Sequence, residues 1–268
     1  MAQLAQAEAV ELLRPESARD PAFRARLSEL AADVFLVASY GELFDQELLT
    51  MPARACLNVH GSLLPRWRGA APVQAAILAG DEVSGVSVQR MVRALDAGDV
   101  LLSRETPIGP ETTGGELFDR LAELGADAAL AALDLIAAGD AQFTPQDPAA
   151  VTRCRKLAKS AGTLDWSQDA TALERRVRAM TPRPGARTTL PDGRVLGVKR
   201  ATVVTGRSGV AGTPDAESLD QGRLVIHAGK DALELIEVQP AGKRPMPAAD
   251  FLRGARLDPE ARLGQEQA

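Results

Sequence analysis

The stretch Cys56-Leu57-Asn58-Val59-His60-Gly61-Ser62 is a short apolar run that ends in polar residues. Such a run is typical of a β-strand that is buried on both faces of a sheet. Three further runs of this kind lie at 34–38, 86–91 and 100–102. Helical patterns alternate with these runs, which predicts an α/β fold with a parallel sheet and connections on its faces.

Two segments show the patterns of helices beside this sheet. Apolar residues between Asp20 and Ala31 recur at spacings of three and four, as in an amphipathic helix. Thr113-Gly114-Gly115-Glu116 has the sequence of a capping box, and an apolar face follows as far as Ile136. We expect this second helix to end at Gly139.

The second half of the chain has a different pattern. Short apolar runs alternate with turn sequences such as Pro191-Asp192-Gly193, which favours a small β-barrel. Residues 140–155 contain two prolines and are typical of a linker. The sequence therefore predicts an α/β domain at 1–139, a linker at 140–155 and a barrel domain at 156–268.

The size and composition exclude several classes of protein. A chain of 268 residues with 45% hydrophobic content can bury a core, and a prior of roughly 150 residues per domain gives two unequal domains. Its two Cys and two His are too scattered for a disulfide framework or a metal site built from neighbouring ligands. No apolar run approaches the roughly 18 residues of a membrane span. We therefore expect a reduced, cytoplasmic protein that has no metal and does not bind membranes.

The net charge of −5 conceals an asymmetry along the chain. Residues 1–150 carry a net charge of −11, whereas 151–268 carry +6. Within 153–200 there are 12 Lys and Arg against four acidic residues. This excess indicates a surface that meets a polyanion, although a solvated basic face would show the same excess.

Asn58, His60 and Asp96 are the residues that could carry chemistry. Asn58 is the only asparagine in the chain, and alternation along a strand places its side chain on the same face as His60. Asp96 lies in an acidic turn after the third run. An amide and an imidazole that face a developing oxyanion, with a carboxylate that orients the imidazole, suit acyl transfer. A hydrogen-bonded turn beside an ordinary acidic loop is the alternative.

Longer motifs surround these residues. Asn58 and His60 open the sequence Asn-Val-His-Gly-Ser-Leu-Leu-Pro-Arg-Trp-Arg-Gly-Ala-Ala-Pro-Val-Gln at 58–74, and Leu-Asp-Ala-Gly-Asp follows at 95–99. Further motifs occupy 156–159, 164–167, 181–186 and 242–246. Together they resemble the methionyl-tRNA formyltransferases of the folate-dependent formyltransferase family, over nearly the whole chain.

The resemblance implies a fold and a reaction. The fold is a Rossmann-like formyltransferase domain followed by a small β-barrel of oligonucleotide-binding (OB) type. The reaction moves the formyl group of the co-substrate 10-formyltetrahydrofolate to the α-amino group of methionyl-initiator tRNA, for translation initiation. By residue match, Asn58 and protonated His60 stabilise the oxyanion, and Asp96 holds His60. The resemblance assigns these residues to the folate site: Ser62, Leu63, Leu64, Pro65, Tyr40, Gly41 and Phe44.

The implied partner is initiator methionyl-tRNA, which the basic second half of the chain would meet. The residues expected to contact tRNA are Arg66, Arg68, Arg153, Arg155, Lys156 and Lys159. We expect a monomer with no protein partner.

The chain departs from the family pattern at its start. Family members normally have a strand, a Gly-Thr-Pro turn, a helix and a second strand before the segment that resembles 13–17, where this sequence has only residues 1–12. The resemblance thus implies that the first domain is shortened at its N-terminus. Three explanations stay open: a start assigned too far downstream, a decayed copy, or a fold with a changed sheet edge that binds without catalysing. Two other functions stay open: a catalytically impaired remnant that binds tRNA or folate, and a sugar-nucleotide N-formyltransferase.

Overall fold

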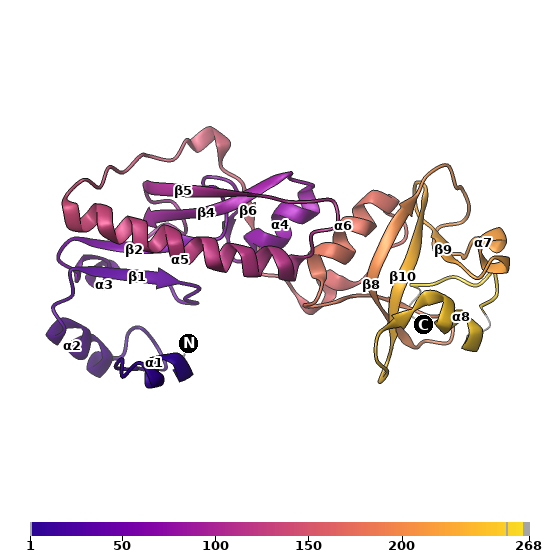
Figure 1. Cartoon of the computed structure of the whole chain (residues 1–268), viewed down its shortest axis with the longest axis horizontal. Helices are drawn as coiled ribbons and strands as arrows, with labels where there is room; N and C mark the ends of the chain where they lie inside the picture. Colours follow the sequence, from indigo (N-terminus) through magenta and orange to yellow (C-terminus); the bar gives the residue numbers. More distant parts are fainter. Residues whose placement is uncertain (1, 256, 265–268) are drawn as a thin grey trace. The chain divides into compact units, whose positions relative to one another are not determined.

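The computed structural model describes residues 2–255 and 257–264 (Figure 1). Their contacts cluster into two compact units, each assembled from separate stretches of the chain. The first unit comprises the chain up to residue 68 with 85–104 and 123–152, and the second comprises the rest. The expected linear boundaries at 139 and 155 stay a prediction.

A four-stranded sheet with the order β1-β2-β4-β5 forms the centre of the α/β fold. Its strands are β1 (Val34–Ala38), β2 (Ala55–His60), β4 (Val83–Arg90) and β5 (Val100–Pro107). All four predicted runs therefore lie in strands, and the α/β class is confirmed. The two central strands are the most buried, and every residue from 84 to 89 is buried in β4.

The direction of pairing changes across β2. β1 and β2 are parallel, as predicted, and Ala38 lies opposite Val59. β2 and β4 are antiparallel, and His60 lies opposite Ser87. The sheet is therefore mixed, whereas the sequence predicted a parallel sheet. Apolar runs do not reveal this difference, because a central strand is buried on both faces whichever way its neighbours run.

Helix α5 (Gly114–Ala138) covers part of this sheet (Figure 1). It begins at the predicted capping box, in which Glu116 Oε2 accepts from Thr113 N at 2.9 Å and Thr113 Oγ1 accepts from Glu116 N at 3.3 Å. A Cβ atom added to Gly125 would lie 3.2 Å from a methyl group of Val59. Glycine therefore allows the helix to approach β2 closely.

The remaining helices of the first half are short. They are α1 (Ala2–Ala7), α2 (Pro21–Glu29), α3 (Gln46–Thr50) and α4 (Pro72–Ala79). The helix predicted after Asp20 is confirmed as α2, and the Asp20 side chain caps it by accepting from Phe23 N at 2.8 Å. Short strands β3 (Arg68–Gly69) and β6 (Arg153–Cys154) form a two-stranded sheet. Two 3-10 turns follow α5, η1 (Pro148–Ala150) and η2 (Lys159–Gly162).

The C-terminal part contains an antiparallel sheet with the order β11-β10-β8-β7, and β9 also pairs with β10. Its strands are β7 (Ala186–Thr189), β8 (Val195–Val204), β9 (Leu224–His227), β10 (Ala232–Pro240) and β11 (Met246–Pro247). Its helices are α6 (Ala170–Met180), α7 (Ala216–Asp220) and α8 (Ala248–Gly254). The antiparallel sheet agrees with the predicted OB-like domain. None of the helices in the described ranges is long and apolar enough to cross a membrane.

Candidate active site

Two neighbouring strands place four polar side chains together at the end of β2. In the antiparallel register, Asn58 lies opposite Gln89 and His60 lies opposite Ser87. Alternation puts all four on one face of the strand pair. His60, Ser87 and Gln89 are buried, at 7%, 0% and 2% exposure. The predicted pair of Asn58 and His60 therefore belongs to a larger polar cluster inside the protein.

His60 lies between two oxygen atoms. Its Nε2 atom is 2.9 Å from the carbonyl oxygen of Trp67, and its Nδ1 atom is 3.7 Å from Asp96 Oδ1. The His60 and Asp96 side chains are only 8% and 10% exposed. The Trp67 carbonyl only accepts hydrogen bonds, so this contact requires a proton on Nε2.

The Asn58 carboxamide is available to a ligand. The side chain is partly exposed, and within the described part of the chain it makes no hydrogen bond. Its NH₂ group can therefore donate to an oxygen bound beside His60 without breaking an existing bond.

The turn that carries Asp96 is tightly held. Asp96 has a φ of +51°, in the left-handed region that a residue with a Cβ rarely adopts. Gln89 Nε2 donates to Asp96 Oδ1 at 3.2 Å. A Cβ atom on Gly98 would lie 1.8 Å from the carbonyl oxygen of Arg90, so only glycine allows the turn to lie this close to β4. The carboxylate is thus fixed beside His60 by the turn and by its neighbouring strand.

Three polar residues of this cluster were not predicted from the sequence: Ser87, Gln89 and Gln146. A signal existed for the first two, because both alternate with valines in an otherwise buried strand. No signal existed for Gln146, which lies in the predicted linker. Its carboxamide nitrogen donates to the carbonyl oxygens of Asp96 at 3.0 Å and of Gly98 at 2.6 Å.

The segment predicted to line the folate site follows β2 directly. Ser62 is only 1% exposed, and its hydroxyl donates to the Arg66 carbonyl at 2.5 Å. Ser87 Oγ donates to the Ser62 carbonyl at 2.9 Å and accepts from Leu64 N at 3.0 Å. These bonds hold the loop in shape, while Leu63, Leu64 and Pro65 are partly exposed.

The other predicted folate residues follow β1. Tyr40 and Phe44 pack edge to face, with ring centroids 5.5 Å apart, and Gly41 lies between them in sequence. Burial raises the pKa of the Tyr40 hydroxyl, with Glu42 adding to the effect. Because β1 and β2 are parallel, this loop and the loop that follows His60 leave the same edge of the sheet.

The predicted tRNA contacts fall into two groups by exposure. Arg66, Arg153, Arg155, Lys156 and Lys159 are exposed, as phosphate contacts require. The Arg66 guanidinium lies over the Trp67 ring, 5.0 Å from its centroid. Arg68 differs, because it is 9% exposed and its Nε and Nη2 atoms donate to Gln146 Oε1 at 3.0 and 2.8 Å. The structure thus places Arg68 inside the polar cluster.

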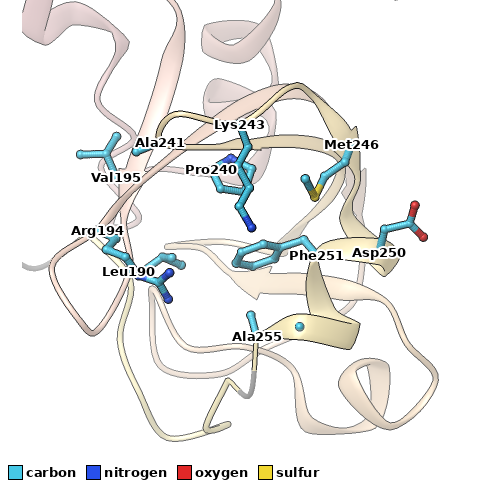
Figure 2. Close-up of a pocket in the computed structure, with 11 residues that line it drawn as sticks. Leu190, Arg194, Val195, Pro240, Ala241, Lys243, Met246, Asp250, Phe251 and Ala255 are labelled. Atoms are coloured by element: carbon cyan, nitrogen blue, oxygen red, sulfur yellow. The ribbon is translucent and has the colours of Figure 1, made fainter.

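Neither the cysteine Cys56, nor a metal-ligating group, nor the C-terminal cavity adds a second catalytic centre among the described residues. Burial raises the pKa of the Cys56 thiol to about 11, so it carries little thiolate at neutral pH. No three His, Cys, Asp or Glu side chains in the described ranges are grouped so as to hold a metal ion. A cavity of about 170 Å³ in the C-terminal part lies between Phe251, Lys243 and Arg194 (Figure 2) and contains none of the predicted site residues.

Known proteins resemble this chain over most of its length. The chain matches the family models for formyl transferase at residues 2–133 and for the formyl transferase C-terminal domain at 156–256. It is 42% identical to a methionyl-tRNA formyltransferase of Methylobacterium sp. (strain 4-46), over 97% of this chain and 83% of the relative. A methionyl-tRNA formyltransferase of Myxococcus xanthus (strain DK1622) is also 42% identical, over 96% of this chain and 81% of the relative.

Solved structures share the fold at lower identity. HypX from Aquifex aeolicus, in complex with tetrahydrofolic acid, is 22% identical with a TM-score of 0.62, covering 87% of this chain and 41% of HypX. An N-formyltransferase from Helicobacter canadensis, in complex with folinic acid and dTDP-3-aminofucose, is 13% identical with a TM-score of 0.65, covering 89% and 81%. The matches to both family models and the identity to curated relatives show that the chain belongs to the formyl transferase family.

Proposed function

We propose that this chain transfers the formyl group of 10-formyltetrahydrofolate to the α-amino group of methionyl-initiator tRNA, for translation initiation. One observation carries the proposal: His60, buried at the end of β2, lies 3.7 Å from the Asp96 carboxylate, on the same strand face as the unbonded amide of Asn58. The curated relatives are named methionyl-tRNA formyltransferases, which supports this acceptor.

The chemistry has two bond changes. The amine nitrogen attacks the formyl carbon, a C–N bond forms, and the formyl oxygen gains negative charge. The bond from this carbon to N10 of the folate then breaks, and the proton lost by the amine passes to N10. Asn58 and His60 donate hydrogen bonds to the negatively charged oxygen. Stabilising this charge is usually the largest single contribution to catalysis of acyl transfer. Asp96 faces the His60 ring and keeps it in place.

The proposal requires the Nε2–H of His60 to change partner. In the structure it is directed at the Trp67 carbonyl, and Trp67 has a φ of +57°. The substrate oxygen takes over this donor during the reaction. Within the described residues, the Asn58 amide has no such partner to give up.

The two loops at the shared sheet edge form the proposed folate site. Leu63, Leu64 and Pro65 offer partly exposed apolar surface for the pterin ring, and the packed rings of Tyr40 and Phe44 form a second wall. A Cβ atom added to Gly41 would meet no other atom within 4 Å, so this position of the loop faces open space. Ser62 acts through its bond to the Arg66 carbonyl, which shapes the loop.

The exposed residues Arg153, Arg155, Lys156 and Lys159 are the proposed phosphate contacts of tRNA.

A direct assay tests the function. Purified protein, 10-formyltetrahydrofolate and charged initiator tRNA should yield formylmethionyl-tRNA, while a dTDP-amino sugar in place of the tRNA should yield no formyl product. Turnover with the sugar alone would identify a sugar N-formyltransferase. Folded protein without turnover on either acceptor would support a binding remnant.

Removing two of the exposed cations should weaken tRNA binding in a salt-dependent way. We expect the Lys156→Gln/Lys159→Gln variant to bind initiator tRNA less tightly and to lower the slope of log K against log salt by about 0.9 for each lost phosphate contact. Binding measured between 50 and 200 mM salt checks this, with Lys230→Gln, another exposed lysine, as the control. An unchanged slope in the double variant would place the phosphate contacts elsewhere.

A further inference from the structure

Gln146 connects the predicted linker to the catalytic turn. Its carboxamide NH₂ group, which has two N–H donors, faces three oxygens: the carbonyls of Asp96 and Gly98, at 3.0 and 2.6 Å, and Gln89 Oε1 at 3.3 Å. Its oxygen accepts the two bonds from Arg68 at 3.0 and 2.8 Å. One side chain therefore joins the turn, the central strand β4 and the segment that follows β2.

The chemistry of the neighbours decides which way this amide faces. A guanidinium only donates hydrogen bonds and a backbone carbonyl only accepts them. The amide oxygen must therefore face Arg68, and the nitrogen must face the turn. A glutamate would keep the bonds from Arg68 but would bring a negative charge to the carbonyl oxygens of Asp96 and Gly98.

The Asp96 turn needs such support. A residue other than glycine is sterically strained in the left-handed region, so this conformation persists where neighbours hold it. Gln146 bonds the main chain of Asp96, and Gln89 bonds its carboxylate at 3.2 Å. The Gln146 amide also contacts the Gln89 amide. The main chain and the carboxylate of Asp96 are therefore held by two side chains that contact each other.

The distance from Asp96 to His60 makes this support relevant to the reaction. At 3.7 Å the carboxylate and the imidazole are close enough for a charge interaction but beyond an ordinary hydrogen bond. A shift of less than 1 Å in the turn therefore decides whether the two groups bond or separate.

The linker also holds the loop on the other side of His60. Thr152 Oγ1 accepts from Trp67 N at 2.8 Å, and the Thr152 carbonyl accepts from Arg68 N at 3.0 Å. Trp67 supplies the carbonyl that faces His60 Nε2. Residues 144–152 therefore contact both neighbours of the His60 ring: the Asp96 turn, which faces Nδ1, and the Trp67 segment, which faces Nε2.

We infer that Gln146 is a positioning residue for formyl transfer, which holds the Asp96 turn so that its carboxylate faces His60 and which is itself oriented by Arg68. This inference rests on the proposed function of the site. It assigns a positioning role to a residue of the 140–155 segment, which the sequence predicts only as a linker.

The test compares Gln146→Glu with Gln142→Glu, the same substitution at an exposed position of the same segment. Misplacing a catalytic group by about 1 Å can cost a factor of about 10², so we expect Gln146→Glu to lower kcat by about 10–100-fold. The KM values for folate and tRNA should change little, because Gln146 contacts neither proposed binding surface. Gln142→Glu should match the unmodified protein in both parameters.

A double-mutant cycle with Asp96 separates positioning from general damage. In the Asp96→Ala background there is no carboxylate left to position, so Gln146→Glu should have little further effect on kcat. Multiplicative losses in the double variant would overturn the inference.

A readout without turnover keeps the inference testable if the proposed function fails. The chain has only two histidines, so its imidazole NMR signals can be assigned with one substitution. Gln146→Glu should move the His60 signals and leave those of His227 in place, while Gln142→Glu moves neither. An unchanged His60 signal in folded Gln146→Glu would overturn the inference, whereas inactive unmodified protein would count against the proposed function alone.

Discussion

The His60→Ala variant is expected to lose formyl transfer by a factor of about 10²–10⁴ in kcat, the contribution of a positioned acid or base. Alanine removes both ring nitrogens. The variant therefore loses the proposed hydrogen bond to the oxyanion and the group that faces Asp96. The loss should fall mainly on kcat, because the imidazole acts on charge that develops in the transition state. Steady-state formylation of charged initiator tRNA measures it.

The second histidine provides a matched control for this prediction. His227 is 8% exposed, and its Nε2 atom lies 3.6 Å from Asp215, whereas His60 is 7% exposed and lies 3.7 Å from Asp96. Both substitutions therefore remove a buried imidazole beside a carboxylate, and both can lower the melting temperature. Only His60→Ala should abolish turnover. Equal losses of kcat in the two variants, measured below both melting temperatures, would show that the effect is one of stability and would contradict a catalytic His60.

The Asn58→Asp variant is expected to lower kcat by about 10²–10³-fold, the cost of removing one donor from an oxyanion site. Aspartate has nearly the same shape as asparagine, but it replaces the NH₂ donor with a negative charge that repels the developing oxyanion. Because the Asn58 amide has no partner within the described residues, no native hydrogen bond is lost. The melting temperature should therefore change little.

A second substitution at this position separates charge from shape. Asn58→Ala removes the donor without adding a charge, so it should be less damaging than Asn58→Asp. The order of kcat, from unmodified protein through Asn58→Ala to Asn58→Asp, is the specific expectation. If both variants turn over as fast as the unmodified protein, Asn58 does not contact the reacting oxygen.

Much of the fold was predictable because its signals are local. The apolar runs at 34–38 and 56–60 became neighbouring parallel strands, and the capping box at Thr113 begins α5. Burial, alternation and capping depend on residues a few positions apart, so a single sequence contains them. The antiparallel pairing of β2 with β4 depends on how distant segments meet, and no local pattern encodes it.

The candidate site, like the fold, was predictable where local patterns specify it. Asn58 and His60 share a strand face because side chains alternate, and the short acidic turn supplied Asp96 as the carboxylate. Arg68 was predicted to contact tRNA, but Gln146 accepts two of its hydrogen bonds inside the protein.

The amino-acid sequence by itself determined the fold class, the family and the three groups that can perform acyl transfer. Only the tertiary structure decided which groups surround them: Gln89 opposite Asn58, Gln146 on the Asp96 turn, and the Trp67 carbonyl on His60. The physical reason is that residue type and periodicity specify what a side chain can do and which face it occupies. A contact between groups that no local pattern links forms only when the folded chain brings the two groups together.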